Sequence, residues 1–408
     1  FLFPQIRELA TGYGKLGGIW FDGLDKHADM WRTPDMLKML RGIQPHMVFN
    51  HRCAPRHWRF GDFDGPEKHI GRFQTNRPWE TCTTIGGGWG WSGPGPAKEL
   101  ADCVRMLVRC AGNGGNLLLN TGPAPDGKIN PRHVERYLQI GAWLQQFGES
   151  IYATRGGPYK PGPWGCATRS KEGNTVYVHV LSHWNGVIRL PDLPASVVAT
   201  RVLTGGTATV TQSAGELTVA IDPHEKRGRE YLLHEFDTVI ALDLDRPATS
   251  LPITDSVGES LTIGAKAPAS SQSGPDSSPQ TLVASDLQEF SEGVFVKQRW
   301  SPDSKDKEPW VQLDLANPAI INQIAIQEGR PGSVGAVQAF TISLRVDGDW
   351  LAVHDGDAIG GSFGLILPES HLADAIRLDF QQWGGRISVN QINAYGKQPS
   401  VRHDDLHK

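Results

Sequence analysis

The stretch Gly17-Gly-Ile-Trp-Phe21 opens the pattern that decides the fold of the first part of the chain. It is typical of a short buried strand, and a helical stretch over 33–42 and a second apolar run, His46-Met-Val-Phe-Asn50, follow it. The alternation continues with a weaker strand at 79–83, a helix over 97–112, a strand at 116–120 and a helix over 131–147 that Gly148 closes. Such alternation predicts parallel strands with helical crossovers. Four units of this kind are about half of a (β/α)₈ barrel.

The pattern becomes all-β after residue 158. Six β-rich segments separated by Gly, Pro, Asn and Asp turns predict an antiparallel β-sandwich over 159–246. A stretch rich in Pro, Ser, Thr and Gly follows, and its first part, 247–259, is a predicted linker. Strand signals return over 260–397 and predict a second all-β domain, before a polar tail at 398–408. The fold class is therefore multidomain, with a partial α/β barrel over 1–158 followed by two β domains.

Composition excludes several classes of protein. Among 408 residues, 40 are Lys or Arg and 44 are Asp or Glu, so the chain lacks the basic excess of a general binder of nucleic acid or anionic membranes. No apolar run approaches the length of a membrane span. Five cysteines, an odd number without a CxxC pair, argue against a zinc site and a disulfide framework and leave the cellular compartment open. Because the chain starts at Phe1, we expect it to be part of a longer polypeptide.

Polar side chains follow the predicted strands, where a barrel carries its catalytic groups. They are Asp22, then His51 and Arg52, then Asp62, Asp64 and Glu67 in a predicted long loop, and Glu80 in the weaker strand. Five tryptophans accompany them: Trp20, Trp58, Trp79, Trp89 and Trp91. Glycoside hydrolysis needs two carboxyl groups, and indole rings stack on sugars. The pattern therefore points to a glycosidase.

Each of these residues also has a plain structural interpretation. An Asp-Gly pair after a strand is often a turn, so Asp22 alone would be a weak candidate. Glu67 follows Pro66 and could begin a helix, where the backbone dipole favours a carboxylate. Glu80 could be satisfied by backbone donors. Trp20 and Trp79 suit a core as well as a sugar platform, whereas Trp89 and Trp91 lie in a glycine-rich loop that favours the platform.

A family resemblance adds weight to the catalytic interpretation. Ile19-Trp-Phe-Asp-Gly23 resembles the nucleophile strand of the family 29 α-L-fucosidases. Phe49-Asn-His-Arg52, Gly61-Asp-Phe-Asp-Gly-Pro-Glu67, Trp79-Glu-Thr-Cys82 and Asn120-Thr-Gly-Pro-Ala-Pro-Asp-Gly127 follow in the order of that family. The resemblance covers 1–160 as the second half of the catalytic barrel, and 160–246 as the family's C-terminal β-sandwich. It implies retaining exo-hydrolysis of terminal α-L-fucose from glycans, without a metal or cofactor, in an extracellular or periplasmic location.

The resemblance also implies roles for individual residues. Asp22 takes the position of the nucleophile, and Arg52 matches an arginine that contacts the sugar. That arginine lies in an Asn-Asp-Arg motif, and His51 stands here in place of its Asp. Glu67 matches the general acid/base of one branch of the family, whereas other branches place the acid nearer Glu80. Asp62 and Asp64 are weaker candidates for the same role.

The C-terminal domain resembles the discoidin-like F5/8 type C jelly rolls, also called family 32 carbohydrate-binding modules. The matching stretches are Arg299-Trp300, Trp310-Val-Gln-Leu-Asp-Leu315, Ile321-Asn-Gln-Ile-Ala-Ile326 and Ala375-Ile-Arg-Leu-Asp-Phe380. We expect Arg299, Trp300 and Trp310 in its core, and glycan contacts in loops, with Trp350 and Trp383 as candidates. Such modules often hold a structural calcium, which this sequence neither requires nor excludes.

An alternative function stays open. The family's barrel has about four more β/α units before the nucleophile strand, so this chain alone carries only part of a catalytic domain. With His51 replacing Asp and a jelly roll attached, the chain could instead be a non-catalytic carbohydrate-binding protein with a vestigial barrel.

Overall fold

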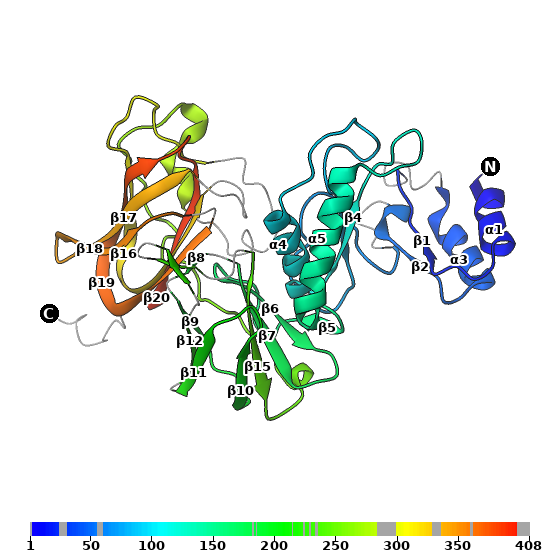
Figure 1. Cartoon of the computed structure of the whole chain (residues 1–408), viewed down its shortest axis with the longest axis horizontal. Coiled ribbons are helices and arrows are strands. Elements are labelled where there is room, and N and C mark those ends of the chain that lie inside the picture. Colours follow the sequence, from blue (N-terminus) through cyan, green and yellow to red (C-terminus); the bar gives the residue numbers. More distant parts are fainter. Residues whose placement is uncertain are drawn as a thin grey trace, which may run out of the picture.

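The computed structural model describes residues 2–23, 31–54, 60–181, 183–184, 186–213, 215–222, 225–227, 230–232, 236–283, 299–328, 336–359 and 362–397. Three parts follow one another along the chain: a mixed α/β part, a first β part and a second β part (Figure 1). The predicted polar tail at 398–408 lies outside the described residues. Within the described ranges, no helix combines the length and the hydropathy that crossing a membrane would require.

The first part contains a path of parallel strand segments. β1 (Gly18–Ile19) pairs with β2 (Val48–Phe49), and β3 (Glu80–Thr84) pairs with β4 (Asn116–Asn120), both in parallel. The segment 63–67 lies between the two pairs, because single parallel bridges join it to residue 50 on one side and to residues 79 and 82 on the other. The sequence predicts a loop there, but backbone hydrogen bonds to both neighbours give this segment the place of a strand. The spatial order of the segments is therefore their order in the chain.

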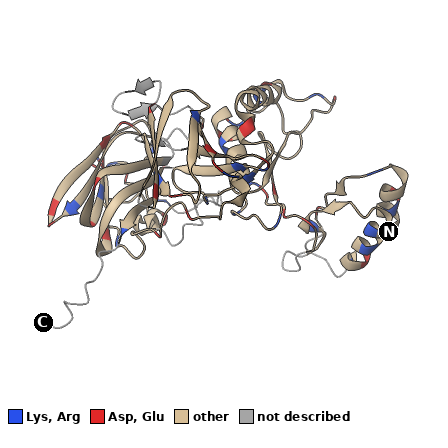
Figure 2. Cartoon of the chain, turned by 90° about the horizontal axis from the view of Figure 1, so that it is seen from below, with Lys and Arg blue, Asp and Glu red and all other residues tan. Residues whose placement is uncertain are grey.

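Helices cover one face of this path. α1 (Leu2–Gly12), which the sequence pattern does not reveal, and α3 (Thr33–Ile43) pack on β1 and β2 through a core that includes Ile6, Met36 and Phe49. α4 (Leu100–Gly112) and α5 (Pro131–Phe147) lie side by side next to β4 (Figure 1). Figure 2 shows that α1 and its neighbours form the end of the molecule farthest from the C-terminal β part.

The second part consists of two antiparallel sheets around one core. One sheet has the order β10 (Val197–Val202), β15 (Thr238–Leu244), β7 (Thr175–Val180), β6 (Gly165–Ser170) and β5 (Thr154–Gly156). The other has the order β11 (Thr207–Ser213), β12 (Glu216–Asp222) and β9 (Val187–Pro191). Alternate apolar residues such as Val178, Leu217 and Ile240 fill the space between them. β13 (Glu225–Arg227) and β14 (Glu230–Leu232) form a separate pair.

The predicted linker at 247–259 packs against this second part. Leu251 belongs to its core, and the Leu251 carbonyl accepts a hydrogen bond from Arg169 at 2.8 Å. A backbone bridge joins Tyr159 to Thr254. These contacts hold the segment in place, because the sandwich offers an apolar site for one of its few apolar side chains.

The third part is an antiparallel sheet of long strands. Its order is β18 (Asp349–Gly356), β17 (Val337–Val346), β19 (Ser362–Trp383), β16 (Trp310–Glu328) and β20 (Val389–Lys397). β8 (His183–Trp184), from the second part, pairs in parallel with β19. Trp300 is fully buried as predicted, but Arg299 is exposed. Trp310 faces away from the core and stacks beneath the Arg377 guanidinium, 4.3 Å from its ring centre, because Val311 and Leu313 take the inward positions.

A buried polar pair joins two strands of the second part. The imidazole Nδ1 of His179, on β7, donates to the carboxylate of Asp237 at 2.6 Å, and both side chains are fully buried. Asp237 directly precedes β15, so the pair fixes where β15 begins beside β7. Removing one partner would leave the other buried without its counterpart.

We predict that Asp237→Ala lowers the free energy of unfolding of this part by about 3–5 kcal/mol, because a buried pair is broken. Asp35→Ala is the control, since its ion pair with Arg32 is largely exposed and should contribute almost nothing. Chemical denaturation checks both variants. Equal shifts of the unfolding transition for the two variants would contradict the structural role of the buried pair.

Candidate active site

Three of the predicted site residues meet at one guanidinium. Arg52 Nη1 lies 3.1 Å from Oδ1 of Asp22 and 3.1 Å from Oε2 of Glu67. Asp22 follows β1, Arg52 lies in the 3₁₀ turn His51–Cys53 after β2, and Glu67 ends the neighbouring segment 63–67. The parallel register thus brings residues from three segments to the same level of the sheet. One cation lies between two carboxylates.

The remaining contacts of Arg52 hold its guanidinium in a fixed orientation. Nη2 donates to the Gly65 carbonyl at 3.1 Å and contacts Cys82 Sγ at 3.4 Å, while the ring centre of Trp20 lies 5.9 Å from Cζ. Burial lowers the pKa of Arg52, but its hydrogen bond to Asp22 and the charges around it raise that pKa above the ordinary value. The Arg52 side chain is only 13% exposed, whereas Asp22 is 78% and Glu67 40% exposed. The guanidinium of Arg52 is therefore held by its buried contacts, whereas both carboxylates remain accessible to a ligand.

Two residues that precede Arg52 also tie strands together. The Asn50 side chain accepts from the backbone N–H of Phe21 and donates to the Phe21 carbonyl, both at 2.8 Å. His51 Nδ1 accepts a hydrogen bond from the Gly65 N–H at 2.8 Å. The sequence pattern assigns no role to Asn50. An Asn that directly follows an apolar run is the signal that could have identified it.

The other predicted acids have different surroundings. Asp62 accepts from Arg41 at 2.6 Å and from the Phe49 N–H at 2.8 Å, and Asp64 pairs with Arg77 at 2.9 Å. These contacts give both carboxylates structural roles. Glu80, on β3, is half-buried, and burial raises the pKa of its carboxyl group. The contact of Arg52 with Glu67 therefore favours Glu67 over Glu80 as the partner of Asp22.

Of the five predicted tryptophans, Trp58 lies outside the described residues, and the other four separate into two groups. Trp20 contacts Phe63 and Arg52 on the site face, and Trp89 and Trp91 are exposed, with Lys68 5.3 Å from the Trp89 ring centre. The prediction that Trp79 forms part of a sugar platform is wrong, because its side chain is only 1% exposed and cannot contact a ligand. Its ring packs so closely on the backbone of Gly71 and Gly115 that neither position has room for a Cβ atom. Trp79 is a core residue.

The face of the strands that carries Asp22 and Arg52 also carries exposed apolar side chains. Trp20, Val48 and Leu118 are 37%, 47% and 39% exposed. Their neighbours Phe21 and Phe49 alternate to the opposite face, where they are buried against the helices. An exposed apolar face beside a polar site is typical of a surface that another part of a protein covers.

The described residues include no group of three or more His, Cys, Asp or Glu side chains that could hold a metal ion. All five cysteines are free and buried.

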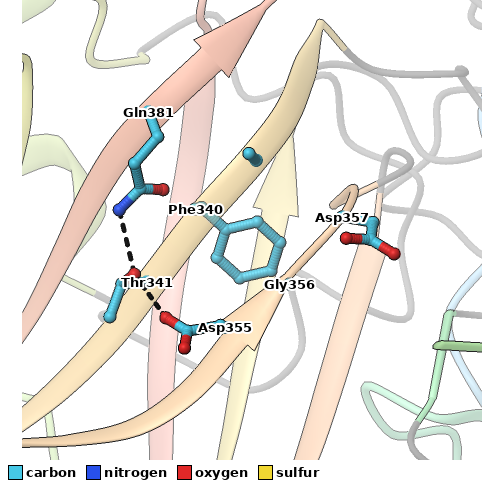
Figure 3. Close-up of a pocket in the computed structure, with 7 residues that line it drawn as sticks. Phe340, Thr341, Asp355, Gly356, Asp357 and Gln381 are labelled. Carbon is cyan, nitrogen blue, oxygen red and sulfur yellow. Dashed lines mark hydrogen bonds between the residues drawn. The ribbon is translucent and has the colours of Figure 1, made fainter. Parts of the chain in front are cut away.

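The C-terminal sheet carries a pocket of about 270 Å³ (Figure 3). Gln381 donates to the Thr341 hydroxyl at 2.9 Å, and Thr341 donates to Asp355 at 2.7 Å, while Asp357 lies on another side of the pocket. Phe340 lies among these polar groups. Of the two predicted candidates for glycan contact, Trp350 is exposed beside Arg345, and Trp383 packs against the core.

Comparisons with known proteins agree with this division of the chain. The family model "Alpha-L-fucosidase" matches residues 1–149, and "F5/8 type C domain" matches residues 266–393. The chain is 31% identical over 238 residues to human tissue α-L-fucosidase, which covers 54% of this chain and 48% of that protein. It is 36% identical over 103 residues to an α-L-fucosidase of Branchiostoma floridae, covering 24% of this chain and 21% of that protein. The chain thus spans about half the length, or less, of the curated relatives it matches.

Solved structures of α-L-fucosidases are also similar to this chain. α-L-Fucosidase isoenzyme 1 of Paenibacillus thiaminolyticus is 29% identical with a TM-score of 0.51, covering 60% of this chain and 62% of that one. An α-L-fucosidase of Vibrio sp. strain EJY3, 19% identical with a TM-score of 0.55, shares the fold over 97% of this chain and 69% of its own. The resemblance found in the sequence motifs is confirmed: residues 1–149 match the α-L-fucosidase family model and residues 266–393 match that of the F5/8 type C domain.

Proposed function

We propose that this chain supplies the catalytic carboxylates of a retaining exo-α-L-fucosidase. The observation that carries the proposal is the shared contact of Arg52 Nη1 with Asp22 and Glu67, at 3.1 Å each. The two carboxylate oxygens are therefore no more than twice that distance apart. Retaining glycosidases have carboxyl groups about 5–5.5 Å apart and inverting ones about 6.5–9.5 Å apart, so the contact favours retention.

The two carboxyl groups have complementary roles in the proposed reaction. The Asp22 carboxylate attacks the anomeric carbon of fucose, the glycosidic C–O bond breaks, and the Glu67 carboxyl group gives its proton to the leaving oxygen. In the second half, the Glu67 carboxylate takes a proton from water. The oxygen of that water attacks the same carbon, and the bond to Asp22 breaks. Fucose leaves with the configuration it had in the glycan.

Neighbouring residues position the sugar and the nucleophile. Arg52 provides a fixed positive charge beside Asp22, and its remaining contacts keep it from following either carboxylate. Trp20, Trp89 and Trp91 provide aromatic surface around the site, and the Trp89 ring contacts Lys68, the residue that follows Glu67 in the chain. Fucose has an apolar face with a methyl group, which suits such rings.

We also infer that further β/α units complete the catalytic domain. The exposed side chains of Trp20, Val48 and Leu118 lie on the face that a closed barrel buries, and β1 and β4 end the parallel path. The matched relatives are about twice as long as the matching region. In this account 1–158 is half of the barrel, 159–246 the sandwich, 247–259 a connecting segment and 260–397 the jelly roll. As a hydrolase of fucosylated glycans, the protein would act outside the cytoplasm.

We predict that Glu67→Gln slows hydrolysis of fucosides with poor leaving groups by about 10²-fold or more, because proton donation is lost. An activated aryl fucoside needs no proton and should form the covalent intermediate at nearly the original rate. Glu80→Gln is the matched control, and its rates should stay near those of the unmodified protein.

Rates and the anomeric configuration of the first product, followed by NMR on the longest polypeptide that carries this sequence, check this prediction. The assignment of Glu67 would be wrong if Glu80→Gln alone showed the dependence on leaving group. A β-configured first product would contradict retention.

One observation favours a second function, carbohydrate binding by the C-terminal domain without catalysis. The pocket on the third part offers a hydroxyl, an amide and carboxylates, which are the groups that bind sugar hydroxyls in proteins. Thr341, Asp355 and Gln381 already form a hydrogen-bonded chain there, so they need little reorganisation on binding.

The two functions depend on different aspartates, hydrolysis on Asp22 and glycan binding on Asp355. We predict that Asp22→Ala abolishes turnover and leaves retention on immobilised glycans unchanged. Asp355→Ala should weaken that retention by about tenfold, which corresponds to the loss of one good hydrogen bond. It should leave turnover of a small aryl fucoside unchanged. Asp349→Ala, at the far end of β18, is the control for Asp355. If Asp22→Ala keeps full turnover, the hydrolase proposal fails.

A further inference from the structure

We propose that His51 is a positioning residue, whose neutral imidazole holds the segment that carries Glu67 in register with Asp22. The inference rests on the proposed roles of these two carboxyl groups. His51 stands where the Asn-Asp-Arg motif has Asp, and its side chain accepts a hydrogen bond from the Gly65 N–H.

The peptide groups around Gly65 are fixed on both sides by the turn that follows β2. The Gly65 N–H donates to His51 Nδ1 at 2.8 Å, and the Gly65 carbonyl accepts from Arg52 Nη2 at 3.1 Å. The His51 N–H in turn donates to the Phe63 carbonyl at 2.9 Å. Two consecutive side chains, His51 and Arg52, therefore hold one glycine two residues before Glu67.

On the other side of Gly65, β3 holds the rest of the segment. The Cys82 N–H donates to the Pro66 carbonyl, and the Lys68 N–H donates to the Cys82 carbonyl, both at 2.9 Å. Pro66 has no N–H, so it makes no backbone contact of that kind toward β2. Within the 63–67 segment, the Gly65 N–H is thus the last amide hydrogen that anchors it toward β2 before Glu67.

The His51 contact exists in only one protonation state. An imidazole Nδ1 that accepts a hydrogen bond must be unprotonated, so the ring is neutral with its proton on Nε2. Protonation would place an N–H opposite the N–H of Gly65, and the hydrogen bond would be lost. As the pH falls, Glu67 should therefore lose its register.

Each element that meets near this contact carries ionisable side chains. They are Arg52 on the same turn, Asp22 after β1, Asp64 and Glu67 on the segment, Arg77, which pairs with Asp64, and Glu80 and Cys82 on β3. Both positive and negative side chains are present among them. Asn or Asp at position 51 would offer an acceptor close to the place of Nδ1 that does not titrate near neutral pH.

Two variants test the inference by moving the acceptor. In His51→Asn the side-chain oxygen replaces Nδ1, whereas in His51→Gln the acceptor shifts to the place of Nε2. Amide hydrogen exchange of Gly65 in the chain as it stands measures the contact directly, expressed as protection relative to the intrinsic rate. We expect unchanged protection in His51→Asn and a loss of about tenfold or more in His51→Gln, the effect of one lost hydrogen bond. At low pH, the unmodified chain should lose protection and His51→Asn should keep it.

Kinetics provide the second readout. In the active protein, we expect the acid limb of kcat to move to lower pH in His51→Asn, and kcat to fall with little change of KM in His51→Gln. Equal Gly65 protection in all three proteins at every pH would overturn the inference. Because exchange needs no turnover, it decides the role of His51 even if no fucosidase activity is found, which would count against the proposed function alone.

Discussion

The structure of the site depends on one shared contact, in which a single nitrogen of Arg52 meets both Asp22 and Glu67. Two carboxylates at this spacing repel each other unless a cation lies between them. The cation itself is anchored by Gly65 and Cys82, so its position is set by the scaffold and not by either acid. This arrangement fixes the spacing of the two groups that the proposed reaction needs.

The scaffold achieves this through three consecutive residues on one short turn. Asn50 binds the backbone of β1 just before Asp22, His51 binds the segment 63–67, and Arg52 reaches both acids. Short strands with few ladder hydrogen bonds would otherwise allow a slip of register, which would turn a side chain such as Asp22 to the other face. Side-chain contacts of this kind replace the regular pairing that longer strands provide.

The strand–helix alternation and the candidate residues Asp22, Arg52 and Glu67 could be predicted from the sequence, because strand ends followed by Asp, Arg or Glu are visible as local patterns. The sequence predicts a loop at 63–67 and not the bridged segment of the structure, since its Gly and Pro hide the pairing and its bridge partners are remote in the chain. The burial of Trp79 depends on Gly71 and Gly115, which only the fold brings to its ring. Arg299 and Trp310 show the same limit, because the sequence does not say which face of a strand a sheet buries.

The central claim is that Asp22 forms the covalent bond to the sugar. The most direct test is to treat the protein with a 2-fluoro-fucosyl fluoride, which slows breakdown of a glycosyl–enzyme intermediate, and to map the labelled peptide by mass spectrometry. The account predicts one fucosyl adduct, on Asp22, which is absent from Asp22→Ala. An adduct on another carboxylate, with Asp22 unmodified, would contradict it.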